Sequence, residues 1–590
     1  MLGLRALLFF RCATLGCRAY ASESVTEEQS TQADPPPPVA QTSPQEAHPG
    51  SHTTAFHPRP PRFCLSTVLW VIFFVALTLA ARCANYRDTF VIDPQGKLQV
   101  YYIDGDCYSR MTRVREILDG WGVIHYHMFE NYPIGIYPHT TAPMDYLIVF
   151  LALLLKPFTP YYIDIAGAII SPILGVLTTA FLAIWARELN QQYRKLMLLM
   201  ASLSPILVHG QSLGRPAHHS LQILLLAVGI GAELIMARAP NVKWSIISGI
   251  AWGLALWVSL YEPLVLIVVL YVTKLIFYRP SLFVKERLWG LGIMALILAI
   301  AYGLEGKYIA KGIYVEMHDP ILKAYFPNWA ATIAEMSPTS IFSDLVQRWV
   351  GWGLLVSPLL LIARLRDTKR SLLLLSLLVT TFAFTLNEIR WGYFFALVYV
   401  MSLPWQLSLF RRKWLVYILF GLSLWPVARE WDALLPGNND EILRDARLDD
   451  QARMRHAAEF IGANAPGGIL APWWWSAALA YWSGQPAVAG SSHEGMSGIV
   501  ATSRFFGTTN PKLAEQICNE REVETVVTGN PEELVIESAH ILGQPLPDKQ
   551  NTMADILWIK PHSAPVFLHL IYDDTVIKVF EVNHGSVSYH

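Results

Sequence analysis

The stretch that decides the fold is residues 214–237, GRPAHHSLQILLLAVGIGAELIMA, in which a polar turn leads into an apolar run. The run from 218 to 237 is long enough to cross about 30 Å of hydrocarbon as an α-helix. Runs of similar length and character occur on both sides of it. The sequence therefore predicts about eleven membrane spans, at roughly 64–84, 161–187, 193–213, 218–237, 244–260, 261–278, 288–304, 349–364, 371–387, 391–411 and 414–430.

The composition also indicates a membrane protein. Of the 590 residues, 53% are hydrophobic and only 15% are charged, whereas soluble proteins average about 25% charged residues. The net charge of -1 excludes a nucleic-acid-binding protein that works through bulk positive charge. The six cysteines form no CxxC pair and no cluster with histidine, which argues against structural zinc and against a disulfide framework.

Three regions follow from the distribution of polar residues. Residues 1–62 are predicted to be a disordered cytoplasmic tail, whose first 20 residues are either a targeting segment or a misassigned start. Residues 63–430 form the predicted transmembrane domain, with outer loops at 85–160 and 305–348. Residues 431–590 form a predicted α/β domain, because expected helices at 450–462, 511–520 and 531–543 alternate with strand-like runs at 468–470, 487–490 and 524–528.

The lysine and arginine residues predict the orientation of the spans. Positive residues are enriched in cytoplasmic loops, and alternating the eleven spans places all the basic clusters on one side. These clusters lie near 187–195, 238–243, 279–287, 364–370 and 411–413. We therefore expect a multi-pass protein of the inner (cytoplasmic) membrane of the cell, with both long loops and residues 431–590 outside the cytoplasm. The apolar run at 146–155 is too short to cross, so we expect it to lie at the interface.

The predicted outer face collects acidic and histidine side chains. Carboxylates and imidazoles together can hold a divalent cation, and such a cation stabilises a departing phosphate oxygen. Arg390, at the outer start of a span, offers the planar bidentate donor that suits phosphate. The acidic and histidine residues on this face are Asp104, Asp106, His125, His127, Glu130, His139, Asp145, His218, His219 and Glu335.

Each of these residues also has a purely structural interpretation. The Asp-Gly-Asp sequence at 104–106 is common in solvated turns, and His218 with His219 can simply cap a helix. Glu335 can be a surface carboxylate, and Arg390 an interfacial anchor. The three tryptophans Trp473, Trp474 and Trp475 can form a buried wedge, part of an interfacial belt or a binding platform.

Taken in order, these motifs resemble one family. Asp-Cys-Tyr at 106–108 follows the first span, Gly-Arg-Pro-Ala-His-His at 214–219 opens a later span, and Thr-Ile-Ala-Glu at 332–335 lies in a long outer loop. Arg390 and the tryptophans at 473–475 come next. The chain resembles the catalytic subunit of oligosaccharyltransferase, a GT-C membrane glycosyltransferase that transfers a glycan from a polyprenyl-linked donor to Asn in Asn-x-Ser/Thr. The resemblance covers roughly 64–497.

The resemblance implies a role for each matched residue. Asp106 and Glu335 would be the catalytic carboxylates, and together with His219 they would hold Mg²⁺ or Mn²⁺. Arg390 would bind the donor phosphate. The tryptophans at 473–475 would bind the acceptor. Further candidates for the site are Asp104, His218 and His139.

The chain departs from the family pattern at two positions. Ala217 stands where the family has an acidic residue, so one expected metal ligand is absent and we expect weaker metal binding. Where the family has Trp-Trp-Asp to recognise the acceptor hydroxyl, this chain has Trp473, Trp474 and Trp475, followed by Ser476. An indole donates one hydrogen bond and accepts none, so the tryptophans cannot replace that carboxylate.

These observations predict a single-subunit membrane glycosyltransferase that moves a sugar or oligosaccharide from a polyprenyl-phosphate or polyprenyl-diphosphate donor on the outer face. The acceptor would be a protein, as in N-glycosylation. A first alternative is a lipid or polysaccharide hydroxyl acceptor, which explains the loss of the Trp-Trp-Asp aspartate. A second alternative is a transporter of the lipid-linked sugar, although the spans are largely free of charge and show no repeat. A third is an inactive relative, suggested by Ala217.

Overall fold

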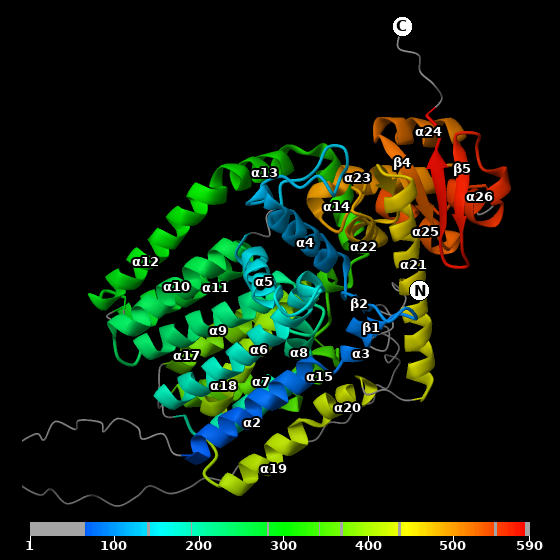
Figure 1. Cartoon of the computed structure of the whole chain (residues 1–590). Helices are drawn as coiled ribbons and strands as arrows, with labels where there is room; N and C mark the ends of the chain where they lie inside the picture. Colours follow the sequence, from blue (N-terminus) through cyan, green and yellow to red (C-terminus); the bar gives the residue numbers. More distant parts are fainter. Residues whose placement is uncertain are drawn as a thin grey trace, which may run out of the picture.

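The computed structural model describes residues 65–584 except 139–141, 190, 280–281, 342, 366–369, 435–437 and 548–550. The predicted tail at 1–62 lies outside the described residues. A large bundle of helices is joined to a smaller helix-and-sheet region that stands at one end of it (Figure 1). The element order therefore gives a helical body followed by a mixed α and β tail.

The bundle consists of helices of very different lengths. Among the described residues, three helices are long and apolar enough to cross a membrane, Tyr162–Glu188, His218–Met236 and Glu286–Gly306. The bundle helices are α2 (Leu65–Arg82), α6 (Tyr162–Glu188), α7 (Arg194–Leu203), α8 (Pro205–Gly210), α9 (His218–Met236), α10 (Val242–Val258), α11 (Tyr261–Phe277), α12 (Glu286–Ala301), α16 (Ser357–Arg364), α17 (Arg370–Asn387), α18 (Gly392–Leu407), α19 (Lys413–Ser423) and α20 (Trp425–Leu434).

Several predicted spans are broken helices. The run at 193–213 is divided into α7 and α8 because Ser204 leaves the helical conformation (φ -58°, ψ 116°) before Pro205. A proline lacks the N–H group that would continue the helix and restricts the residue before it. The run at 414–430 is likewise divided into α19 and α20. The helical fold is thus established, while the number of eleven spans stays a prediction.

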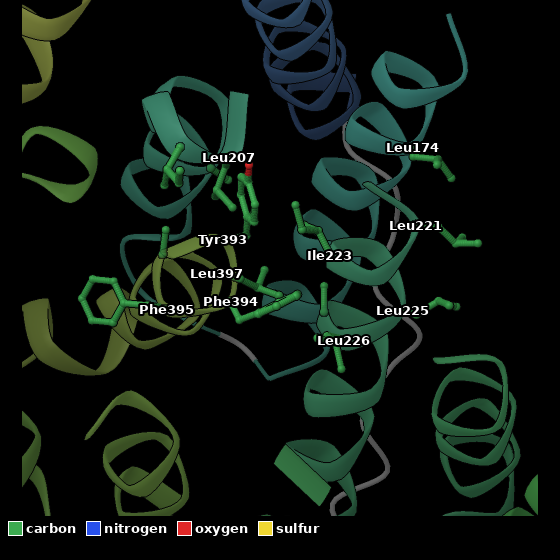
Figure 2. Packing of buried hydrophobic residues seen from close by; sticks show 14 of the residues in the cluster. Leu174, Leu207, Leu221, Ile223, Leu225, Leu226, Tyr393, Phe394, Phe395 and Leu397 are labelled. Carbon is green, nitrogen blue, oxygen red and sulfur yellow. The ribbon is translucent and has the colours of Figure 1, made fainter. Parts of the chain in front are cut away.

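The centre of the bundle is a tight contact between α18 and the helices α8 and α9. Tyr393, Phe394 and Leu397 of α18 face Leu207 of α8 and Ile223 of α9 (Figure 2), and all five side chains are at most 3% exposed. A Cβ atom on Gly210, in α8, would lie 2.8 Å from the ring of Tyr393. The packing therefore fixes Tyr393 beside the end of α8, next to the turn that leads into α9.

The two long connections carry short elements. The first contains an antiparallel pair, in which Phe90 pairs with Val100 and Ile92 with Leu98. Its elements are α3 (Tyr86–Thr89), β1 (Phe90–Ile92), β2 (Leu98–Val100), α4 (Gly105–Glu116), η1 (Ile117–Trp121) and α5 (Ala142–Leu155). The second connection and the turn before α18 contain η3 (Tyr302–Gly306), α13 (Lys307–His318), α14 (Pro320–Ala330), η4 (Ala334–Met336), α15 (Leu345–Val350), η5 (Trp352–Val356) and η6 (Ile389–Trp391).

The tail contains a four-stranded mixed sheet in the order β3-β4-β6-β5. Strand β3 runs parallel to β4, while β4 with β6 and β5 with β6 are antiparallel. The expected strand at 487–490 is reduced to one bridge between Ala487 and Ile469. The elements are α21 (Asn438–Asn464), β3 (Gly468–Leu470), α22 (Trp473–Ser483), η7 (His493–Gly495), α23 (Met496–Gly507), α24 (Pro511–Glu520), β4 (Val523–Thr528), α25 (Pro531–Leu542), α26 (Met553–Ile559), η8 (Pro561–Ser563), β5 (Leu568–Asp573) and β6 (Lys578–Val582).

The tail docks on the first connection through α22 and α4. The Nη1 group of Arg115 donates to the carbonyl of Tyr481 at 2.6 Å, and its guanidinium lies 3.8 Å from the centre of the Tyr481 ring. The hydroxyl of Tyr481 also bonds to the carboxylate of Asp164, in α6. On the other side of the tail, the rings of Trp329 (α14) and Trp473 are 5.6 Å apart. These contacts hold α4 between the bundle and the tail.

Candidate functional site

Two aspartates begin helix α4. Asp104 is the N-cap residue, and its Oδ1 atom accepts a hydrogen bond from the Cys107 N–H group at 3.0 Å. Such a cap satisfies one of the free N–H groups at a helix start. Asp106 lies in the first turn, and a Cβ atom on the neighbouring Gly105 would lie 3.1 Å from Cβ of Ser491. The aspartates therefore lie where the tail meets the first connection.

Asp106 has a carboxyl group that resists ionisation. Its side chain has exposed surface, but the protein atoms packed around it remove part of its solvation. This desolvation, together with the charges of Asp104, Glu130 and Glu335, raises the pKa of Asp106 to about 7, although the Ser491 hydroxyl acts in the opposite direction. A carboxyl group with such a pKa can both hold and release a proton near neutral pH.

The turn before α9 brings an arginine to these carboxylates. Gly214 adopts a φ of 75°, a conformation that glycine takes without strain, and the next residue, Arg215, is only 3% exposed. The Nη2 group of Arg215 lies 2.6 Å from Oε1 of Glu335 and 3.5 Å from Oδ2 of Asp104. One buried guanidinium therefore bridges two carboxylates that are far apart in the sequence.

A directed chain of hydrogen bonds connects Arg215 to helix α18. Arginine can only donate, so Nε2 of His209 accepts from Nη1 of Arg215 at 3.1 Å. The Nδ1–H group of His209 then donates to the Tyr393 hydroxyl at 3.0 Å, and that hydroxyl donates to Oε1 of Glu335 at 3.2 Å. The tautomer of His209 is inferred from these partners. The chain fixes the orientation of both Arg215 and Glu335.

Glu335 is held in its ionised form. Burial alone would raise its pKa, but the positive charge of Arg215, with smaller effects of His219 and His209, outweighs burial and lowers the pKa of Glu335 to about 2. Its side chain is 30% exposed, so a ligand can reach it. The site thus combines a permanently ionised carboxylate with Asp106, whose pKa is shifted in the opposite direction.

His218 and His219 stack at the start of α9, with ring centres 4.0 Å apart. The ring of His219 lies 5.4 Å from the ring of Tyr393, and its Nε2 atom is buried without a hydrogen-bond partner among the described residues. His219 therefore lies next to Tyr393, whose hydroxyl donates to Glu335. His218 lies beside it on the helix end.

Arg390 lies beside the segment that carries Glu335. The N–H group of Ile389 donates to the carbonyl of Ser337 at 3.2 Å, which joins the two segments. The Nε group of Arg390 donates to Oε2 of Glu388 at 2.7 Å, and its guanidinium lies 6.0 Å from the centre of the Tyr261 ring. The side chain is 25% exposed. Its partners orient the guanidinium and leave part of it open to a ligand.

The three tryptophans of α22 point to different surroundings. Trp473 packs against Trp329, and Trp475 lies where a Cβ atom on Gly529 would be only 2.2 Å from its ring. Ser476 is fully buried and donates to the carbonyl of Ala471 at 3.0 Å. Its hydroxyl therefore does not take the place of the aspartate that the resemblance leads one to expect.

A small hollow lies beside the first two tryptophans, in the angle between α22, α23 and α25. Three polar atoms on its walls are buried without hydrogen-bond partners in the described structure, namely Nε1 of Trp473, Oγ1 of Thr502 and Oε2 of Glu537. Burial and the neighbouring Glu533 raise the pKa of Glu537 to about 7. Buried polar atoms are normally paired, so the hollow suits a small ligand group that donates and accepts hydrogen bonds. Its lining residues are Pro472, Trp473, Trp474, Ile499, Thr502, Ser503, Phe506, Leu534, Glu537, Ser538 and Ile541.

Several predicted residues have other partners. Asp145 is buried in ion pairs with Arg110 and with Arg113, the latter at 3.0 Å. His127 pairs with Glu116 at 2.9 Å. His125 stacks on Tyr308 with ring centres 4.0 Å apart. His139 lies outside the described residues. Glu130 is buried, and neither of its carboxylate oxygens has a hydrogen-bond partner in the described part of the chain.

The described donor set does not fit a metal ion well. Over the residues that the structure describes, no three or more His, Cys, Asp or Glu side chains lie close enough together to hold one. Asp106, His219 and Glu335 do not form such a group, and the methyl group of Ala217 supplies no ligand. The guanidinium of Arg215 already lies between Glu335 and Asp104. Binding of Mg²⁺ or Mn²⁺ therefore stays a prediction.

The sequence did not identify the three residues that organise this site. Arg215 lies within the 214–219 motif, yet its position in the sequence does not indicate which carboxylates it contacts. His209 and Tyr393 lie within apolar runs, where a lone polar residue gives a weak signal. Only packing brings these three residues together.

The structure was compared with known proteins. No family model and no curated protein matches the sequence. Among solved structures, the Archaeoglobus fulgidus oligosaccharyltransferase AglB, in complex with an inhibitory peptide and a dolichol-phosphate, is 14% identical, with a TM-score of 0.63, covering 86% of this chain and 80% of that one. The complex of the A. fulgidus enzyme with Zn and sulfate is 15% identical, with a TM-score of 0.59, covering 86% and 79%.

A third structure is similar over nearly its whole length. ArnT from Cupriavidus metallidurans, bound to undecaprenyl phosphate, is 13% identical, with a TM-score of 0.51, covering 88% of this chain and 99% of that one. At such identities the similarity concerns the fold. The motifs at 106–108, 214–219 and 332–335 thus predicted the architecture correctly, and the chain has the helical GT-C membrane fold that it shares with these oligosaccharyltransferase and ArnT structures.

Proposed function

We propose that the protein is a membrane glycosyltransferase that moves a sugar or oligosaccharide from a polyprenyl-phosphate or polyprenyl-diphosphate donor to an acceptor. The observation that carries the proposal is the arrangement around Glu335. An ionised carboxylate, fixed by Arg215 and Tyr393, lies on a segment bonded to the one that presents Arg390. Asp106, a carboxyl group with a pKa of about 7, interacts electrostatically with Glu335.

These groups suit an inverting displacement. A nucleophilic atom of the acceptor forms a bond to the anomeric carbon of the sugar, and the bond from that carbon to the phosphate oxygen breaks. The electron pair leaves with the polyprenyl phosphate or diphosphate, and the proton of the acceptor passes to a carboxylate of the site. Asp106 and Glu335 orient the acceptor, and Arg390 binds the departing phosphate. Stabilising such charge usually contributes most to catalysis.

The ligands of the similar structures support a lipid-phosphate donor. AglB was solved with a dolichol-phosphate, and ArnT with undecaprenyl phosphate. Arg390 of this chain is partly exposed and held by Glu388, and an arginine so oriented can bind two phosphate oxygens at once. The donor is therefore proposed to present its phosphate to Arg390.

The leading acceptor is a protein asparagine, as in oligosaccharyltransferases. The peptide bound to AglB and the hollow beside Trp473 and Trp474 support this proposal. In the hollow, Glu537 offers the carboxylate that is missing at Ser476, and Thr502 offers a hydroxyl. An acceptor hydroxyl can donate to the first and accept from the second.

A second candidate is a lipid or polysaccharide hydroxyl acceptor. One observation favours it: the aspartate of the family's Trp-Trp-Asp is absent, and Ser476, which follows the three tryptophans, is fully buried. Acceptor competition separates the two, because a peptide acceptor predicts that an Asn-x-Thr peptide receives the sugar while the matched Gln-x-Thr peptide does not.

The surroundings of the enzyme are part of the proposal. We place the protein in the inner membrane, with residues 1–62 in the cytoplasm and the site and residues 431–590 outside it, acting as a single subunit. The transmembrane domain would extend to residue 430, which lies within α20. The support for this orientation is the basic clusters of the sequence.

The test measures release of polyprenyl phosphate or diphosphate from a lipid-linked sugar by the purified full-length protein. Glu335→Gln is expected to slow release by about 100-fold or more, the usual effect of removing one such electrostatic group. Glu430→Gln is the matched control, because Glu430 is also held by a partly buried arginine, Arg348, at 3.4 Å outside the site. No release by the wild type, with donor instead moved between vesicle leaflets, would reject the proposal in favour of a transporter.

A further inference from the structure

We infer that Arg215 is the built-in cation of this reaction centre and takes the charge-neutralising role that the resemblance assigns to a divalent metal ion. The inference rests on the proposed function. It makes the transfer independent of added metal, and it identifies Arg215 as a residue that the chemistry requires. Three structural observations support it.

The first observation is the position of the charge. The Nη2 group of Arg215 lies between Oε1 of Glu335 (2.6 Å) and Oδ2 of Asp104 (3.5 Å), and the Arg215 side chain is 4% exposed. A cation between two carboxylates is the arrangement that a divalent ion would otherwise create. A metal ion would have to displace this guanidinium, and the displaced arginine would leave a buried charge without its partners. Ala217, two residues later, offers no ligand in compensation.

The second observation is that Arg215 is held in place from behind. Its Nη1 group donates to His209, which is itself fixed by Tyr393. The backbone is anchored as well, since the carbonyl of Arg215 accepts a hydrogen bond from the hydroxyl of Ser171. A charge fixed in advance stabilises developing negative charge without reorganisation. The guanidinium is therefore a fixed part of the site.

The third observation is one unused donor. The Nε group of Arg215 is buried and has no hydrogen-bond partner among the described residues. Arginine recognises phosphate through several N–H groups at once. The free Nε–H group can donate to an oxygen of the departing phosphate while Nη2 keeps Glu335 ionised. Arg215 would thus act on the leaving group together with Arg390.

The deciding experiment uses the wild-type protein, purified at full length with its lipid-linked sugar donor. Donor release is measured after treatment with EDTA and again with added Mn²⁺, and Mn²⁺ binding is measured separately by electron paramagnetic resonance. We expect the rate in EDTA to stay within about twofold of the rate with Mn²⁺, a difference far below the 100-fold effect of losing one charge-stabilising group. A loss of release in EDTA that Mn²⁺ restores would overturn the inference.

The binding measurement does not depend on activity. We expect that the wild type has no stoichiometric Mn²⁺ site that depends on Glu335. Wild type and Glu335→Gln should therefore bind Mn²⁺ equally. If the wild type binds one Mn²⁺ and Glu335→Gln abolishes that binding, the inference fails even where no donor has been found. If the wild type releases no phosphate under any condition, the proposed function fails, and the binding result still decides whether a metal ion takes the place of the Arg215 guanidinium beside Glu335.

Variants of Arg215 provide the positive evidence. Arg215→Gln is expected to slow donor release by about 100-fold in EDTA, and Arg215→Lys, which keeps the charge, is expected to lose less. Arg348→Gln is the matched control, because Arg348 also bridges two carboxylates, Asp344 (3.0 Å) and Glu430 (3.4 Å), and also has an unpartnered Nε group. Unchanged release by folded Arg215→Gln would overturn the inference. If that variant does not fold, the wild-type measurements decide.

Discussion

At the scale of single residues, the pKa values of two carboxyl groups of one site are shifted in opposite directions. Asp106 has a pKa raised to about 7 by desolvation and by Asp104, whereas Arg215 outweighs burial and lowers the pKa of Glu335 to about 2. The side-chain chemistry of the two is the same, so the environment makes the difference. Such a pair provides one permanently charged group and one that exchanges protons near neutral pH.

Arg390 gives a prediction about donor binding. Arg390→Lys should raise KM for the lipid-linked donor by about tenfold while kcat changes less, because an ammonium cannot replace the bidentate contact of a guanidinium with phosphate. Steady-state kinetics with varied donor concentration measure both constants. Arg504→Lys, an exposed position in the tail, is the control. A fall in kcat with an unchanged KM would contradict a role in binding the donor.

Glu537 gives a prediction about pH and stability. Burial and Glu533 raise the pKa of Glu537 from 4.5 to about 7, so the folded protein binds this proton more tightly than the unfolded chain. Its contribution is fully present below about pH 4.5 and is lost as the pH rises through 7. The Tm of the wild type should therefore fall, between pH 5 and pH 8, more than the Tm of Glu537→Gln. Parallel curves for the two proteins would exclude this pKa shift.

At the scale of elements, three bundle helices are joined by a buried group of charges. Glu233 of α9 bonds to Lys274 of α11 and pairs with Arg287 of α12 at 2.9 Å. Ser248 of α10 donates to the same carboxylate at 2.6 Å. The side chain of Glu233 is 1% exposed. The apolar runs predict spans almost free of charge. The structure instead pairs the charged groups of α9, α11 and α12 with one another, and a serine of α10 donates to the same carboxylate.

This group predicts a large effect on stability. Glu233→Gln leaves two buried cations without a counter-charge, and breaking a buried ion pair in this way costs about 3–5 kcal/mol. A clear fall in the Tm of the purified protein is therefore expected. The exposed Glu188→Gln is the control for loss of a carboxylate. A Tm equal to that of the wild type would show that the cluster contributes nothing to stability.

The helices and strands of the structure also show which elements the apolar pattern of the sequence predicts. The run predicted at 218–237 is α9 (His218–Met236). The prediction is accurate because this apolar run begins at a polar turn and is not interrupted by proline. The sequence predicts one span at 193–213, but the structure has two helices there, because Pro205 interrupts the run. In the tail, the sequence correctly predicts a strand at 468–470 but does not predict β5 and β6, which the structure shows paired with each other and, through β6, with β4.

At the scale of the whole molecule, the tail and the bundle share one core. Buried residues of α22, including Ala477, Leu479 and Tyr481, belong to the same cluster as the bundle residues Leu174 and Ile223. The tail stands against α4 and α14 (Figure 1). The position of Ser491 next to Gly105 shows that this docking brings the tail beside the start of α4, where Asp106 lies.

Docking predicts a test on Arg115. Arg115→Ala removes the hydrogen bond to the Tyr481 carbonyl and the stacking on its ring, so amide hydrogen exchange in α22 should become faster and donor release slower. Arg453→Ala, which removes an arginine that pairs with Asp449 and Asp574 in the tail, is the control. Unchanged exchange in α22 would mean that the interface does not depend on Arg115.

The sequence by itself determined the class of molecule. Its long apolar runs require helices that satisfy their own backbone hydrogen bonds in a membrane, and the order of Asp106, the 214–219 motif, Glu335 and Arg390 indicated the GT-C fold. The partner of each charge was decided only by the tertiary structure. The bridge from Arg215 to Glu335 spans 120 positions, and the contact from Tyr393 to Glu335 spans 58. Electrostatic shifts depend on distances in space, which the folded helices set and the spacing along the chain does not.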